Sequence, residues 1–285
     1  MLWIKTIPEM RDLVARWRKN GESVGLVPTM GFFHQGHLAL MKKARQENEE
    51  VVVSLFVNPT QFGPGEDFEQ YPRNRERDEK LAEEAGVDVV FNPAAVEMYD
   101  REFQTFVDLT ELPQGLCGAA RPGHFRGVAT VVTKLFNIVQ PERAYFGEKD
   151  AQQLRVIKRM AVDLNIPVDI RAVPTVREED GLAMSSRNTY LSPEERQAAL
   201  VLSKSLFFAK AQVETGERNS ERLKEKMKEL ITGEPLVSLE YLEIRASDTL
   251  RPVSIIAEEV LIALAARAGK TRLIDNITIN PEGRR

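Results

Sequence analysis

The chain has 285 residues, of which 42% are hydrophobic and 29% are charged, and its formal net charge is −4. These proportions are typical of a globular protein with an ordinary buried core, and the length allows one large domain or two smaller ones. The negative net charge argues against binding to long nucleic acid, which requires a basic surface.

Neither a membrane span nor a signal peptide is indicated by the hydropathy pattern. No apolar run approaches the roughly 18 residues that cross a bilayer, and the first residues lack a basic region followed by an apolar one. Cys117 is the only cysteine, so no intramolecular disulfide can form. We therefore expect a cytoplasmic protein that binds no membrane, since such chains suit a reducing compartment.

The first part of the chain alternates between strand and helix patterns. A short strand at residues 3–5 precedes a helix that opens at Pro8 and ends at Gly21. Residues 23–28 and 51–57 are near-continuous apolar runs, the pattern of parallel strands that are covered on both faces. A helix from Gly36 to about Glu47 lies between them.

The same alternation continues to about residue 173. Further strands are expected at 87–91, 143–146 and 168–173, and helices at 75–85, 128–139 and 151–164. Strands that alternate with helices predict an α/β fold, here a Rossmann-like domain with a parallel sheet.

The last third of the chain has a different pattern. Ser192-Pro193-Glu194-Glu195 is a capping box with proline at the first helical position. A charged helix is expected at 220–231, and strands are expected at 237–245, 260–267 and 273–278. We predict a smaller α+β unit, with domains at 1–175 and 176–285.

Two of the three histidines lie in the segment His34-Gln35-Gly36-His37. They follow the strand that ends at Pro28, so they would lie at the carboxyl end of the sheet, where open α/β sheets bind ligands. Open N–H groups at the start of the next helix favour phosphate, and Gly36 lets a nucleotide approach the backbone. Histidine donors would meet the negative charge that develops on a pentavalent phosphorus.

Two alternatives to a phosphate site stay open for the histidines. The pair could be an ordinary polar surface. His34, His37 and His124 could instead hold a catalytic zinc ion, although no His-Glu-x-x-His spacing or cysteine cluster supports one.

Two further clusters favour ATP. Gly147-Glu148-Lys149-Asp150 follows an expected strand, and a lysine there can neutralise phosphate as a compact charge. Met184-Ser185-Ser186-Arg187 offers two hydroxyls and a guanidinium in succession, which are donors suited to a triphosphate. Each cluster alone could be a solvated loop or a hinge, but the three in order predict ATP binding.

Longer stretches carry a resemblance to a known family. These are Pro28 to His37, Phe56 to Phe62, Arg121 to Val128, Phe146 to Gln153, Asp180 to Asn188 and Arg272 to Asn276. Together they resemble the pantothenate synthetase family over essentially the whole chain. The departures are small: Thr60 stands where methionine is common, and Phe32-Phe33 replaces a small or polar residue followed by leucine.

The resemblance implies the condensation of pantoate with β-alanine, with ATP and Mg²⁺, in pantothenate and coenzyme A biosynthesis. It implies a pantoyl adenylate intermediate, release of AMP and pyrophosphate, a C-terminal lid domain and a homodimer. A nucleotidyltransferase that makes a dinucleotide or CDP-linked product is the alternative enzyme. A silent ATP sensor with a partner-binding C-terminal domain is the alternative outside catalysis.

The resemblance also implies roles for individual residues. The catalytic set is His34, His37, Lys149, Ser185, Ser186 and Arg187. The ATP-binding set is Met30, Gly31, Phe32, Phe33, His34, Gln35, Gly36, His37, Gly147, Glu148, Lys149, Asp150, Val176, Met184, Ser185, Ser186 and Arg187. The substrate-binding set is Gln61, Gln153, Asn58, His124 and Tyr71. No protein ligand of the metal is assigned, and Asp78 is only a possible neighbour of magnesium.

Overall fold

The structure is a computed structural model that describes residues 1–283, and the chain forms two compact units. Unit 1 consists of Met1–Pro113, Arg121–Glu148 and Gln153–Pro174. Unit 2 consists of Gln114–Ala120, Lys149–Gln152 and the described residues from Thr175 onward. The division at residue 175 into an ATP-binding domain and a lid stays a prediction.

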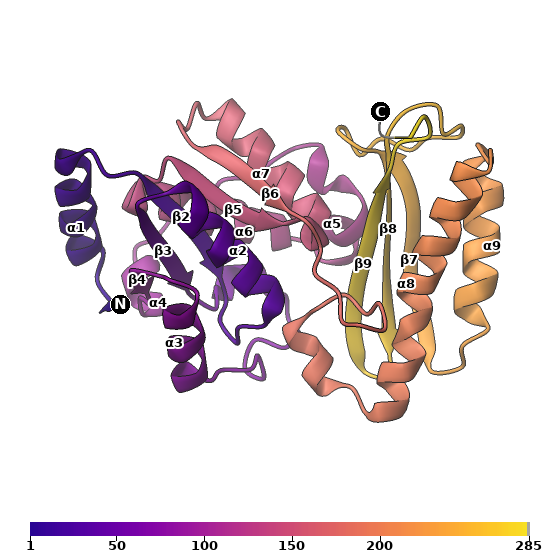
Figure 1. Ribbon diagram of the computed structural model, residues 1–285, viewed down its shortest axis with the longest axis horizontal. Coiled ribbons are helices and arrows are strands. Elements are labelled where there is room, and N and C mark those ends of the chain that lie inside the picture. Colours follow the sequence, from indigo (N-terminus) through magenta and orange to yellow (C-terminus); the bar gives the residue numbers. More distant parts are fainter. Residues whose placement is uncertain (284–285) are drawn as a thin grey trace. The chain divides into compact units, whose positions relative to one another are not determined.

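Unit 1 contains a six-stranded parallel sheet in the order β1-β4-β3-β2-β5-β6 (Figure 1). Its strands are β1 (Leu2–Ile4), β2 (Val24–Thr29), β3 (Glu50–Leu55), β4 (Val89–Phe91), β5 (Arg143–Gly147) and β6 (Asp169–Val173). The chain winds outward in one direction from β2 and in the other from β5, so the strand order reverses between these neighbours. Ligands of such sheets bind outside the carboxyl ends of the strands at this point.

Helices connect these strands, as the sequence predicts. The helices from this part of the chain are α1 (Ile7–Asn20), α2 (Gln35–Glu47), α3 (Arg75–Glu84), α4 (Ala95–Met98), α6 (His124–Val139) and α7 (Ala151–Asp163). Val51, Val52 and Val53 on β3 are fully buried, which confirms that this strand is covered on both faces of the sheet. The α/β fold expected from the sequence is confirmed.

Two differences concern short or displaced helices. No pattern in the sequence indicates α4 or α5 (Leu116–Ala120), because four or five residues are too few to show a helical period. Helix α6 begins at His124 rather than at Val128. Gly123 has a φ of 83°, a left-handed conformation that breaks the preceding turn and lets the helix start there.

Unit 2 contains a three-stranded antiparallel sheet with two long helices beside it (Figure 1). The elements are α8 (Pro193–Glu214), α9 (Ser220–Thr232), β7 (Val237–Ala246), β8 (Val260–Ala268) and β9 (Thr271–Ile279). Leu206 of α8, Leu223 of α9 and Ile262 of β8 are fully buried in one core. The predicted capping box is present, since Ser192 Oγ accepts from the Glu195 N–H at 3.2 Å and the Glu195 carboxylate accepts from the Ser192 N–H at 2.9 Å.

Among residues 1–283, no helix combines the length and the apolar character that a bilayer crossing would require.

Candidate active site

The paired histidines form the cap of helix α2, directly beyond the carboxyl end of β2. His34 is the N-cap residue, and its Nδ1 accepts from the Gly36 N–H at 3.1 Å. His37 Nδ1 accepts from the His34 N–H at 3.3 Å, and the two ring centroids lie 4.1 Å apart. Because each Nδ1 is an acceptor, each neutral imidazole carries its proton on Nε2 and is a donor there.

Four backbone N–H groups of this loop are not open, although the sequence led us to expect open groups at the helix start. The imidazoles of His37 and His34 accept hydrogen bonds from the N–H groups of His34 and Gly36, respectively. The carboxylate of Asp78 accepts hydrogen bonds from the N–H groups of Phe32 and Phe33, at 2.7 and 2.6 Å. These four N–H groups already have acceptors within the protein, so they are not available to a phosphate group.

Asp78 lies on α3 and is 1% exposed. Burial raises the pKa of this carboxyl above its ordinary value, and the hydrogen bonds from Phe33 and Phe32 act in the opposite direction. Among residues 1–283, no group of three or more His, Cys, Asp or Glu side chains is placed to hold a metal ion.

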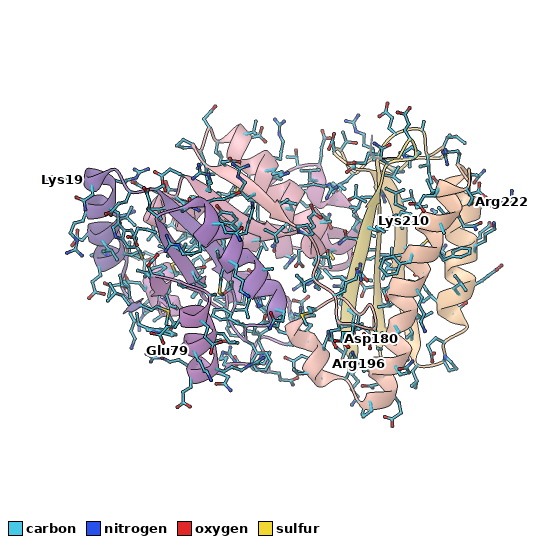
Figure 2. All side chains as sticks on the ribbon, viewed as in Figure 1. Lys19, Glu79, Asp180, Arg196, Lys210 and Arg222 are labelled. Carbon is cyan, nitrogen blue, oxygen red and sulfur yellow. The ribbon has the colours of Figure 1, made fainter. Side chains whose placement is uncertain are left out.

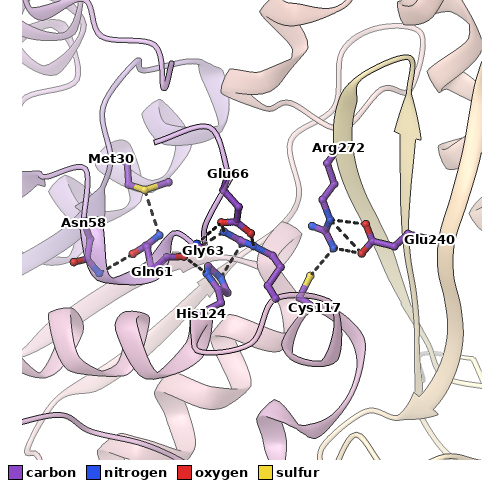
Figure 3. Close-up of polar contacts among 10 residues, drawn as sticks. Met30, Asn58, Gln61, Gly63, Glu66, Cys117, His124, Glu240 and Arg272 are labelled. Atoms are coloured by element: carbon purple, nitrogen blue, oxygen red, sulfur yellow. Dashed lines mark hydrogen bonds and ion pairs between the residues drawn. The ribbon is translucent and has the colours of Figure 1, made fainter. Parts of the chain in front are cut away.

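Gln61 lies at the end of a short 3-10 turn, Pro59–Gln61, that follows β3. Its Oε1 accepts from Asn58 Nδ2 at 3.1 Å, which directs its Nε2 toward Met30 Sδ, 3.3 Å away (Figure 3). Met30 belongs to the loop before α2. The structure therefore places the expected acid-binding amide beside the expected nucleotide loop.

The amide of Asn58 is held from both ends. Its Nδ2 also donates to the Gly127 carbonyl at 3.1 Å, while its Oδ1 accepts from the hydroxyls of Tyr99 at 2.8 Å and Thr60 at 2.9 Å. Burial raises the pKa of Tyr99, so its phenol stays a donor. Thr60 supplies a hydrogen bond that methionine could not make, and Asn58 is 1% exposed. Asn58 thus orients Gln61.

Helix α6 approaches this turn closely at Gly127. A Cβ atom added to Gly127 would lie 2.3 Å from the Thr60 carbonyl oxygen and 2.7 Å from the Gln61 Cα. Only glycine allows this approach.

His124, the first residue of α6, holds the backbone of the same turn. Its Nδ1 lies 2.8 Å from the Gln61 carbonyl, which can only accept, so this nitrogen carries the proton. Its Nε2 then accepts from Arg121 Nη1 at 3.1 Å, and Arg121 forms a bidentate pair with Glu66 at 2.6 and 2.7 Å (Figure 3). Burial acts to raise the pKa of Glu66, but the hydrogen bond and charge of Arg121 hold it below its ordinary value.

The structure also describes the other expected ligand-binding residues of unit 1. Gln153 is half-buried on α7, and its amide has no hydrogen-bond partner among residues 1–283. Tyr71 is buried with its ring edge against Phe62, at a centroid distance of 6.1 Å. Gly147 ends β5, and Glu148 after it is exposed.

Lys149 of unit 2 lies in a 3-10 turn, Glu148–Asp150. Its carbonyl accepts from Asn276 Nδ2 at 2.7 Å, which fixes the backbone. Within the described part of the chain, neither the Lys149 ammonium nor the Asp150 carboxylate has a hydrogen-bond or ion-pair partner. A half-buried lysine without a counter-ion is suited to an anionic ligand.

The serine cluster of unit 2 follows a hairpin that β9 holds. The Val176 carbonyl accepts from the Met184 N–H at 3.0 Å, and Arg177 forms a bidentate pair with Asp275 at 2.7 and 2.9 Å. Ser185 then caps a 3-10 turn by accepting from the Arg187 N–H at 3.3 Å, and Ser186 is buried.

The structure shows which contacts the residues of the motif Arg272 to Asn276 make, which the sequence alone did not reveal. Asp275 holds the hairpin and Asn276 holds the backbone of Lys149. Arg272 pairs with Glu240 at 2.7 Å and lies 3.7 Å from Cys117 Sγ (Figure 3). The motif itself could be recognised in the sequence. Its contact partners could not, because they lie far away along the chain.

These features define a Rossmann-like α/β protein in which histidine and amide side chains gather at the carboxyl ends of central strands. The model of the pantoate-beta-alanine ligase family matches residues 2–278, and the chain belongs to this family of enzymes.

Relatives and solved structures agree with this membership. The pantothenate synthetase of Heliobacterium modesticaldum is 58% identical over 98% of this chain and 99% of its own. That of Caldicellulosiruptor saccharolyticus is 54% identical over the same shares. The pantothenate synthetase structure from Thermus thermophilus has a TM-score of 0.93 and 49% identity, and covers 97% of this chain and 99% of its own.

A further solved structure contains ligands. The pantoate-beta-alanine ligase from Francisella tularensis, complexed with beta-gamma ATP and beta-alanine, has a TM-score of 0.80 and 33% identity. It covers 100% of this chain and 99% of its own.

Proposed function

We propose that this enzyme condenses pantoate with β-alanine at the expense of ATP, through a pantoyl adenylate. The observation that carries the proposal is the 3.3 Å contact between Gln61 Nε2 and Met30 Sδ. An acid that attacks the α-phosphate directly must lie against the nucleotide, and this contact joins the expected acid site to the expected nucleotide loop. The ATP and β-alanine held by the Francisella tularensis ligase support the same substrates here.

In the first step, a pantoate carboxylate oxygen attacks the α-phosphorus of ATP. An oxygen–phosphorus bond forms, the bond to the β-phosphate bridging oxygen breaks, and pyrophosphate leaves. Gln61 and Gln153 offer neutral amides that bind the hydroxyls of pantoate without pairing with the attacking carboxylate. His34 and His37 would donate from Nε2 to the phosphate oxygens as charge develops.

In the second step, the amine of β-alanine attacks the acyl carbon of the adenylate. The carbon–nitrogen bond forms, the acyl–oxygen bond to AMP breaks, and the nitrogen releases its extra proton to water. Lys149, Ser185, Ser186 and Arg187 are proposed to bind the phosphates, Asp150 a ribose hydroxyl, and Val176 the adenine side.

Magnesium would enter with the triphosphate. Mg²⁺ is often held by substrate phosphates with one or two carboxylates and keeps several waters, so no dedicated protein cage is required. When bound it would neutralise phosphate charge. A homodimer and a cytoplasmic location also belong to the proposal, the first from the resemblance and the second from the single cysteine.

The products of the complete reaction test this proposal. With ATP, Mg²⁺, pantoate and β-alanine, we expect AMP and pantothenate in equal amounts, measured by chromatography with mass detection. ADP would indicate an acyl-phosphate ligase instead. Pyrophosphate without AMP would indicate a nucleotidyltransferase, and ATP binding without any product would indicate a sensor.

A further inference from the structure

The carboxylate of Asp78 fills an anion-binding concavity made by the loop before α2. Gly31 and Phe32 have φ values of 87° and 52°, so two successive residues are in the left-handed region. Successive N–H groups in such a turn point toward one side and attract an anion. Here Asp78 Oδ2 accepts from Phe32 and Oδ1 accepts from Phe33, so the anion comes from the protein itself.

The fit around this carboxylate is tight. A Cβ atom added to Gly31 would lie 3.1 Å from Asp78 Oδ2, so glycine is needed where the loop meets the acid. Arg77, the neighbour of Asp78 on α3, lies over the Phe32 ring at 4.7 Å. Helix α3 therefore holds the loop through both a buried acid and a surface cation.

The loop that Asp78 holds connects two residues that are expected to contact ligands in unit 1. One end carries Met30, which touches Gln61, and the other end carries His34, which caps α2. A non-glycine residue at a φ of 52° persists only where its surroundings impose it. We propose that Asp78 is a positioning residue that imposes the loop conformation needed to bind ATP, rather than a protein ligand of magnesium.

This inference rests on the proposed ATP-dependent function, and its test includes a measurement that does not depend on activity. Amide hydrogen exchange at Phe32 and Phe33 reports the two hydrogen bonds directly. In the unaltered enzyme both amides should exchange slowly. In Asp78→Asn, one oxygen can still accept but the amide NH2 faces the other N–H, so exchange at these two residues should become at least about tenfold faster.

Binding measurements separate positioning from metal ligation. The Kd of a non-hydrolysable ATP analogue should rise about 10- to 100-fold in Asp78→Asn, the range expected for a lost hydrogen bond to a charged group. The KM for pantoate and the Mg²⁺ concentration that gives half-maximal activity should change less than about twofold. Glu79→Gln is the matched control, because Glu79 is the next residue of α3 (Figure 2). It has no hydrogen bond or ion pair among residues 1–283.

Two results would overturn the proposal. One is fast amide exchange at Phe32 and Phe33 in the unaltered enzyme. This measurement does not depend on whether any variant folds. The other is an Asp78→Asn variant in which only the magnesium requirement changes. If the unaltered enzyme forms no AMP, the proposed function fails, while the exchange data still decide whether Asp78 holds the loop.

Discussion

Lys149→Ala should lower turnover by about 10²–10³-fold, the cost of removing one preorganised donor to a developing charge. Stability should barely change, because Asn276 holds the carbonyl of Lys149 and the ammonium has no partner within the described part of the chain. Steady-state kinetics with saturating substrates, together with the thermal midpoint, measure the two effects separately.

Two further variants sharpen the test on Lys149. Lys149→Arg should restore little activity, since the planar guanidinium does not replace a compact ammonium. Lys158→Ala on α7 removes the same charge from an exposed position and should leave turnover unchanged. Unchanged turnover in Lys149→Ala would remove this residue from the mechanism.

His37→Asn should also lower turnover by about 10²–10³-fold while it preserves the helix cap. The Asn side-chain oxygen lies near the position of Nδ1 and can accept from the His34 N–H, but no atom replaces Nε2. Stability should therefore change by less than the ~1 kcal/mol that a lost cap costs. Kinetics and thermal unfolding of the purified variant measure both.

His37→Gln provides the complementary control. Its amide nitrogen reaches the region of Nε2, so part of the activity should return, while the cap weakens. If Asn at this position were as active as His37, donation from Nε2 would play no part in the reaction.

The sequence predicted the fold well where local patterns dominate. Apolar runs such as residues 51–57 favour buried strands, and β3 (Glu50–Leu55) lies there. The Ser192 capping box likewise depends on neighbours three residues apart. Such features are local, so composition and spacing suffice to find them.

The motifs in the sequence predicted which residues form the site, but not the distant residues that hold them in position. The sequence placed His34 and His37 at a helix start, yet it suggested open N–H groups there. The imidazoles of His37 and His34 close the N–H groups of His34 and Gly36, and Asp78, 45 residues from Phe33 along the chain, closes those of Phe32 and Phe33. Asn58 likewise donates to the Gly127 carbonyl, 69 residues away. No periodicity reports such distant pairs.

Isotope exchange between pyrophosphate and ATP tests the central claim most directly. With labelled pyrophosphate, ATP, Mg²⁺ and pantoate, and with β-alanine omitted, label should enter ATP, because a pantoyl adenylate can return to its substrates. Without pantoate, no label should enter. If label stayed out of ATP in an enzyme that makes pantothenate once β-alanine is added, the reaction would not pass through a free-standing adenylate.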